Sequence, residues 1–146
     1  MSIHNKEIAE IWKNEKLAWD SMDSEVILKA RQGSRGFGFR NIAWREYPPE
    51  TEGKMKQAIE QYFSNMEYFR HVNMDVNTWS EGDLGLAWGF FTEEFKHKGQ
   101  SPEKVRVRFS STYRREKGKW RLIMSHNDIQ PFDEEGFYLK ENTRID

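Results

Sequence analysis

The stretch that decides the fold is Val105-Arg-Val-Arg-Phe-Ser-Ser-Thr-Tyr-Arg-Arg-Glu-Lys-Gly-Lys-Trp-Arg-Leu-Ile-Met-Ser-His-Asn-Asp128. Two alternating runs rich in β-branched and aromatic residues flank Lys117-Gly118, a pattern typical of a β-hairpin. With these two residues as the loop, the sequence predicts the following cross-strand pairs: Glu116 with Lys119, Tyr113 with Leu122, Ser111 with Met124, and Phe109 with His126.

One face of this hairpin is expected to be apolar, because directly paired residues share a face and the side-chain period along a strand is two. A histidine and a serine at one end of that face indicate a core that opens into a pocket. A slip of one residue in the register would exchange the two faces. The expected apolar face holds Val105, Val107, Phe109, Ser111, Tyr113, Trp120, Leu122, Met124 and His126.

Length and composition predict a single domain over residues 1–146. The net charge of −1 gives no electrostatic footprint for nucleic acid. Cysteine is absent, which excludes disulfides and thiol catalysis. The polar start and the lack of a long apolar run predict no signal peptide and no membrane partner, so we expect a cytoplasmic protein.

The aromatic content is high for so polar a chain. Aromatic residues make up 14% of the sequence, whereas the mean hydropathy is −0.94. A core built from a few large rings rarely closes every gap. This composition favours a cavity or a subunit interface.

The order of the elements indicates the α+β class, with helices packed on one face of a curved antiparallel sheet. In the second strand, the spacing places Leu84, Leu86, Trp88 and Phe90 on the core face, and the small residues Gly85, Ala87 and Gly89 on the other. Small residues on one face of a strand mark close approach by another element. The predicted helices are 3–22, 24–31 and 52–68, and the predicted strands are 70–80, 83–96, 103–116 and 119–128.

Two motifs resemble the SnoaL-like and ketosteroid-isomerase-like branch of the nuclear transport factor 2-like superfamily. Glu81-Gly-Asp-Leu-Gly-Leu-Ala-Trp-Gly89 resembles a "G-D-x-A-x-V-x-G" strand of that family, and Tyr113-Arg-Arg-Glu-Lys-Gly-Lys-Trp-Arg-Leu-Ile123, followed by His126, resembles its "Y-R-R-x-x-G-x-W-x-I-x-x-x-H" ending. The resemblance implies a cone, in which a curved antiparallel sheet wraps around three helices from the N-terminal half. It also implies a pocket between sheet and helices, and dimers formed through the outer face of the sheet.

Steroid isomerase chemistry does not follow from this resemblance. The isomerases use a carboxylate base after the second helix and a protonated carboxylic acid on the penultimate strand. Here residues 32–45 contain no Asp or Glu, and the penultimate-strand position falls at Ser110 or Ser111. Both carboxyl groups are missing.

The best single candidate for chemistry is His126, because imidazole titrates near neutrality and can act as a base, an acid or an anion contact. The alternative of equal weight is a structural histidine at the end of the sheet. His126 and Asp128 supply only two ligands for a metal, so neither a metal nor any other cofactor is assigned. His4, His71 and His97 fall in a terminus, an exposed strand face and a loop, and they look ordinary.

The ligand-binding residues are expected on the concave face and around the mouth of the cone. Arginines beside Trp44 would hold an anionic ligand there, although solvated arginines and plain core aromatics are the simpler interpretation. The candidates are Trp19, Arg40, Trp44, Tyr62, Met66, Trp88, Phe90, Ser111 and Met124.

Two functions stay open. The first is a domain with an apolar or aromatic pocket for an unknown small molecule, acting as an isomerase, lyase or hydrolase if it is an enzyme at all. The second is a non-catalytic assembly domain, similar to the association domain of calcium/calmodulin-dependent kinase II. A homodimer through the convex sheet face is expected, centred on Gly85, Ala87, Gly89, Arg108, Ser110, Thr112 and Ile123.

Overall fold

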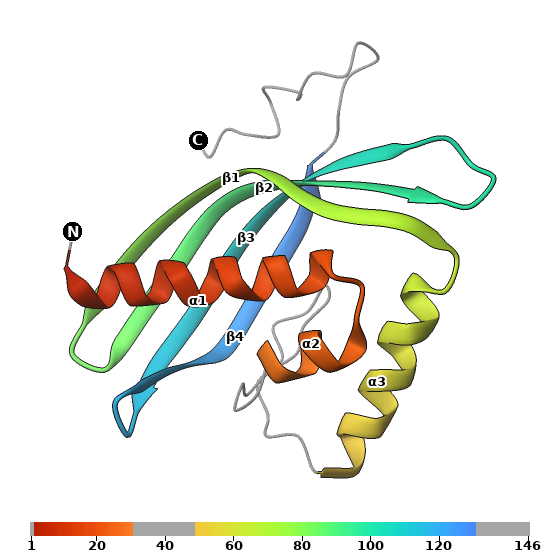
Figure 1. The fold of residues 1–146 in the computed structure, drawn as a ribbon. Coiled ribbons are helices and arrows are strands. Elements are labelled where there is room, and N and C mark those ends of the chain that lie inside the picture. The colour runs from red at the N-terminus through yellow and green to blue at the C-terminus, as the bar shows by residue number, and fades with distance from the viewer. Residues whose placement is uncertain (1, 31–48, 131–146) are drawn as a thin grey trace.

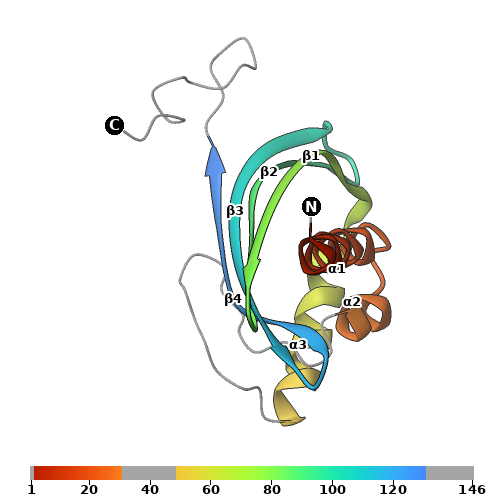
Figure 2. The same ribbon diagram turned by 90° about the vertical axis from the view of Figure 1, so that its left-hand side faces the viewer.

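Helices cover the concave face of a curved four-stranded sheet in the computed structural model, which describes residues 2–30 and 49–130 (Figures 1 and 2). The strands are antiparallel and follow the order β1-β2-β3-β4, so the predicted α+β arrangement is confirmed. Within the described parts of the chain, no helix is both long and apolar enough to cross a membrane. The elements are α1 (Ile3–Asp20), α2 (Ser24–Ala30), α3 (Pro49–Phe63), β1 (Met66–Glu81), β2 (Leu84–His97), β3 (Glu103–Glu116) and β4 (Lys119–Gln130).

The third helix ends earlier than predicted. It stops at Phe63, where the Ser64 hydroxyl and amide both donate to the carbonyl of Gln61, at 2.8 and 3.3 Å. A serine that bonds the backbone of the preceding turn competes with continuation of a helix. Met66 therefore belongs to β1 and not to the helix.

Contacts in the first turns of α1 hold the start of this helix against the sheet. The Ser2 hydroxyl caps the helix by accepting the Asn5 amide at 3.2 Å. The Glu7 carboxylate then accepts the indole N–H of Trp120 at 2.9 Å and contacts His4 Nδ1 at 3.2 Å. The start of the helix is thus tied to β4.

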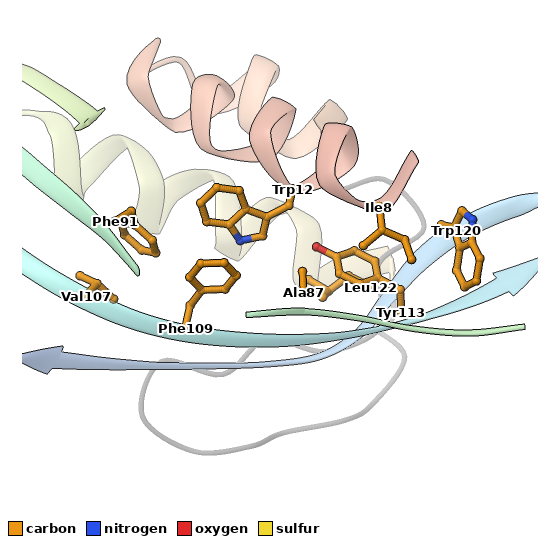
Figure 3. Packing of buried hydrophobic residues seen from close by; sticks show 9 residues of the cluster. All are labelled: Ile8, Trp12, Ala87, Phe91, Val107, Phe109, Tyr113, Trp120 and Leu122. Carbon is orange, nitrogen blue, oxygen red and sulfur yellow. The ribbon is translucent and has the colours of Figure 1, made fainter. Parts of the chain in front are cut away.

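Two groups of buried residues stabilise the fold. The sheet core joins α1 to the concave face, and in it Trp12 stacks on Phe109 with the ring centroids 4.4 Å apart (Figure 3). The helix core joins the three helices to the start of β1. The sheet core is Ile8, Trp12, Ala87, Phe91, Val107, Phe109, Tyr113, Trp120 and Leu122; the helix core is Ala18, Ile27, Ile59, Phe63, Met66 and Phe69.

The faces of β2 are the reverse of those predicted. Ala87 is 1% exposed in the sheet core, and a Cβ added to Gly85 would overlap the Ile8 side chain. The close neighbour that these small residues admit is therefore α1, and not a second subunit. The large residues that were predicted for the core face, Leu84, Leu86, Trp88 and Phe90, consequently lie on the convex face.

Candidate functional site

A carboxylate–imidazole pair with a buried imidazole lies where the end of α1 meets β1. One carboxylate oxygen of Asp20, Oδ1, accepts the backbone N–H of His71 at 2.9 Å and lies 2.6 Å from Nδ1 of the same residue. The His71 side chain is only 2% exposed. The short contact and the low exposure fix the orientation of the ring.

The chemistry of this contact assigns the tautomer of His71. An ionised carboxylate only accepts hydrogen bonds, so Nδ1 must carry a proton in order to bond Asp20. In the neutral imidazole, Nε2 is then a free lone pair that can accept a proton. This nitrogen makes no hydrogen bond to any residue in the described ranges; its neighbour is Glu93, whose Oε1 lies 3.7 Å away.

Aromatic rings surround His71 on both sides. The centroid of its ring lies 5.2 Å from that of Phe69 in the helix core and 5.1 Å from that of Phe91 in the sheet core. The imidazole therefore lies at the junction of the two cores. Apolar surroundings strengthen the electrostatic interactions within such a pair.

A tyrosine from α3 completes the surroundings on the side of Glu93. Partial burial of the phenol, and next the negative charge of Glu93, raise the pKa of Tyr62 to about 12. The phenol is consequently neutral at physiological pH and can donate a hydrogen bond, while its ring remains half exposed.

A β-bulge in β1 turns His71 inward. Val72 pairs with Thr92 and Asp75 with Phe90, so Asn73 and Met74 together oppose a single residue of β2. Asn73 has φ 50°, which asparagine tolerates better than most residues. Before the bulge the odd-numbered residues face the helices, and after it the even-numbered ones do. The prediction that His71 lies on an exposed strand face is therefore wrong.

His126, the predicted catalytic residue, lies on the convex face. The structure pairs Ser110 with His126 and Thr112 with Met124, because Ile123 is an extra residue that no partner on β3 opposes. The predicted pairs of Phe109 with His126 and of Ser111 with Met124 are therefore wrong, as is the concave position of His126 and Met124.

Asp128 and Arg108 occupy the same outer face as His126. The Arg108 guanidinium donates to Asp128 at 3.0 Å, and His126 Nε2 lies 3.0 Å from the other carboxylate oxygen. These contacts, that of Arg108 first, lower the pKa of Asp128. No three His, Asp or Glu side chains among the described residues are arranged to hold a metal ion.

The remaining predicted ligand-binding residues do not gather at one place in the fold. Trp88 and Phe90 lie on the convex face, because their strand presents its small residues to α1. Tyr62 lies beside Glu93, whereas Ser111 is buried on the concave face. Trp19 and Met66 pack in or against the helix core, and Arg40 and Trp44 fall outside the described residues.

Sequence reasoning missed Asp20 and His71. The available signal was the place of Asp20 at the end of a helix, where an anion faces the negative end of the helix dipole at a cost of about 0.3–1 kcal/mol. A residue kept in an unfavourable place points to a partner elsewhere. No pattern in the sequence identified His71 as that partner, because the bulge at Asn73 and Met74 shifts the alternation of faces along β1.

A family model for the SnoaL-like domain matches residues 44–129. The chain belongs to the SnoaL-like domain family. No curated protein sequence matches it significantly.

Solved structures of similar fold cover most of this SnoaL-like chain. A hexachlorocyclohexane dehydrochlorinase from Novosphingobium barchaimii LL02 is 11% identical, with a TM-score of 0.60 and coverage of 85% of this chain and 84% of its own. A proposed dehydratase of the NTF2-like family from Streptomyces avermitilis is 15% identical, with a TM-score of 0.59 and coverage of 84% and 93%. A proposed calcium/calmodulin-dependent protein kinase II association domain from Xanthomonas campestris is 14% identical, with a TM-score of 0.64 and coverage of 86% of each chain. At these identities the likeness concerns the fold.

Proposed function

We propose that this SnoaL-like protein binds a small molecule beside the Asp20–His71 pair and acts as a lyase, with His71 as the general base. The observation that carries the proposal is the 2.6 Å contact between Asp20 Oδ1 and His71 Nδ1 on an almost fully buried imidazole. Such a carboxylate fixes the tautomer of the ring and stabilises the imidazolium that forms when Nε2 takes a proton. The dehydrochlorinase and the proposed dehydratase among the structural neighbours are named for eliminations, which supports this reaction class.

His71, Asp20 and Tyr62 have different roles in the proposed elimination. Nε2 of His71 takes a proton from a carbon atom of the substrate. The electron pair of the broken C–H bond forms the new double bond, and the leaving group departs from the adjacent carbon with its own electron pair. Asp20 remains ionised and holds the imidazolium, while the neutral phenol of Tyr62 is placed to donate a hydrogen bond near Glu93.

The tautomer of His71 tests the proposal without a substrate. Long-range proton–nitrogen NMR spectra of the neutral ring should show hydrogen on Nδ1 and a bare Nε2, and Asp20→Asn should disturb that state. A neutral His71 protonated on Nε2 in the wild-type protein would contradict the assignment of the base.

Two probe reactions test turnover: chloride release from hexachlorocyclohexane, and enone formation from 4-hydroxy-4-phenylbutan-2-one. We expect elimination with at least one probe, and a loss of about 100-fold or more in kcat/KM for His71→Gln. His126→Gln serves as the matched control and should retain the rate. Equal loss in both variants, or no turnover of either probe, counts against a lyase.

The second candidate function, assembly, is favoured by the apolar residues on the convex face. Three large apolar side chains lie on the face of the sheet that points away from α1. They are Trp79, Leu84 and Trp88, which are 41%, 44% and 42% exposed. Exposed apolar groups gathered on one face often mark an interface. The homodimer is therefore proposed to form through these side chains. The residues Gly85 and Ala87 contribute none of it, because they face α1.

Light scattering tests the homodimer. The wild-type protein should have the mass of a dimer at micromolar concentration, and Trp88→Asp should have the mass of a monomer. Leu17→Asp changes an exposed apolar residue on α1, away from the convex face, and should leave the dimer intact. A monomeric wild-type protein would remove the proposed interface.

A further inference from the structure

Two hydrogen-bond acceptors converge on one point of the site. His71 and Glu93 are direct partners across β1 and β2, and Nε2 and Oε1 lie 3.7 Å apart. Because Asp20 holds the proton of the neutral ring on Nδ1, Nε2 is an acceptor there, as is the Glu93 carboxylate. In this neutral state neither group can donate to the other, so either a proton on Nε2 or a donor from outside satisfies the pair.

The charges around this point also favour a positive group. Asp20 and Glu93 supply two carboxylates, and the Lys16 ammonium on α1 lies 5.0 Å from the ring centroid of Phe91. Among the described residues, both charged neighbours of the His71 ring nitrogens are therefore negative. The half-exposed ring of Tyr62, on which the charge of Glu93 acts, adds an aromatic surface of the kind that attracts cations.

We propose that Glu93 is a specificity-determining residue that makes the site accept a substrate with a primary ammonium group, or another N–H donor, and reject a carboxylate. The ammonium group would donate to Glu93 Oε1 beside His71 Nε2, and the lone pair of Nε2 would stay available to the neighbouring carbon. The inference rests on the proposed function only for the place of that carbon; the recognition of the ammonium group stands on the Glu93 carboxylate, which lies 3.7 Å from a ring nitrogen that offers no proton in the neutral form. An anionic ligand, the class expected from the arginines near Trp44, would meet repulsion from Glu93.

The test uses benzylamine, benzyl alcohol and benzoate as probes, at a neutral pH where the amine is charged. Their binding is followed by the imidazole NMR signals of His71 in the full chain. Benzylammonium should shift these signals in a saturable manner, benzyl alcohol should do so more weakly, and benzoate should not. Glu93→Gln should weaken benzylammonium binding by about tenfold or more, because it removes the charge from a hydrogen bond to a charged group.

Glu94→Gln is the matched control. It removes the same charge at the next residue, where the carboxylate pairs with Arg70 at 3.1 Å instead of facing His71. This variant should bind benzylammonium within about twofold of the wild-type protein, since a rim charge outside the contact contributes little. Glu93→Asp keeps the charge on a shorter side chain and should restore part of the binding. Thermal unfolding of each variant verifies that it is folded.

The outcomes separate this proposal from the lyase proposal. Benzoate binding as tightly as benzylammonium, an absence of benzylammonium binding up to its solubility, or equal losses in Glu93→Gln and Glu94→Gln would overturn the role of Glu93. Weakened benzylammonium binding in Glu93→Gln but not in Glu94→Gln, together with no elimination by any form of the protein, would defeat the lyase and leave the recognition of the ammonium group standing. Elimination that requires His71 but shows no preference for substrates with a hydrogen-bond donor would support the lyase and defeat the recognition of the ammonium group.

Discussion

Two histidines on the sheet each contact an aspartate, and they differ in nearly everything else. The aspartate of His71 holds Nδ1, and the imidazole is buried among aromatic rings, with no hydrogen bond to Nε2 from any residue that the structure describes. The aspartate of His126 lies against Nε2 on the convex face, where the His126 side chain is 32% exposed. Arg108 already binds that aspartate.

The difference shows that a histidine–aspartate contact is not by itself a site. At His126 the carboxylate is shared with a guanidinium, so little of its charge is left to orient the ring or to stabilise a proton on it. At His71 the carboxylate binds only the imidazole and its backbone N–H among the described residues. Burial and an undivided carboxylate therefore distinguish the candidate base from a surface contact.

The largest expected effect is a loss of stability at Phe91, and its neighbour Phe90 shows how the two faces of β2 differ. Phe91 is 1% exposed and contacts the rings of Trp12 and His71, whereas Phe90 faces outward. Phe91→Ala should lower the free energy of unfolding by about 3–5 kcal/mol, as expected for a large core residue. Phe90→Ala should lower it by about 1 kcal/mol. Urea denaturation measures both, and similar losses would mean that the two faces of β2 have been assigned wrongly.

Removing each histidine compares the two pairs directly. His71→Ala should lower the free energy of unfolding by about 2–3 kcal/mol, because the partly buried Asp20 carboxylate loses its hydrogen-bond partner and the Phe69 and Phe91 rings lose their contact with the imidazole. His126→Ala should cost less than about 1 kcal/mol, as is usual for exposed pairs. Urea denaturation measures both losses. A larger loss of stability in His126→Ala than in His71→Ala would mean that the outer pair, and not the Asp20–His71 pair, contributes more to the fold.

The titration of Tyr62 examines the surroundings of His71 alone. Because the pKa of Tyr62 is raised to about 12, the folded state prefers the neutral phenol. Its contribution to stability should be complete below the ordinary tyrosine pKa of about 10 and should be lost as the pH rises toward 12. The difference in ultraviolet absorbance between the wild-type protein and Tyr62→Phe should show the late titration. An ordinary titration of this tyrosine would contradict the burial of its phenol beside Glu93.

The smallest effect belongs to the outer pair. The pKa of Asp128 is lowered, mainly by Arg108. Its contribution to stability should be present above the ordinary aspartate pKa and should be lost as the pH falls through the lower value of the folded state. Carboxyl NMR titration should show a higher pKa of Asp128 in Arg108→Gln. An unchanged value would mean that the guanidinium does not hold this carboxylate in solution.

Turn chemistry made part of the hairpin predictable. Lys117 and Gly118 have φ values of 51° and 77°, the left-handed conformation that a two-residue hairpin loop requires. The predicted pairs next to the turn, Glu116 with Lys119 and Tyr113 with Leu122, are confirmed. The backbone preferences of the two turn residues are enough to predict the turn and the strand pairs next to it.

The bulges were not predictable from the same pattern. Ile123 reads as an ordinary β-branched strand residue, and yet it shifts the register of everything that follows it in β4. Asn73 does the same in β1. In both strands the bulge accommodates the curvature of a sheet that wraps around α1, and that curvature depends on contacts distant in the sequence. The two faces of β2 were predicted the wrong way round for a related reason. The close neighbour of Gly85 is Ile8 of α1, and the sequence of β2 does not show where α1 lies.

The length of α1 has a consequence for how this protein can change over evolution. The helix is fixed to β4 by Glu7 near its start and supplies Asp20 as its last residue, and its 18 residues span about 27 Å at 1.5 Å each. One inserted residue would turn Asp20 by about 100° around the helix axis relative to that attachment. Insertions and deletions inside α1 should therefore be selected against far more strongly than those in the turn between β1 and β2, although outward-facing residues of the helix such as Lys6 and Lys13 are exposed.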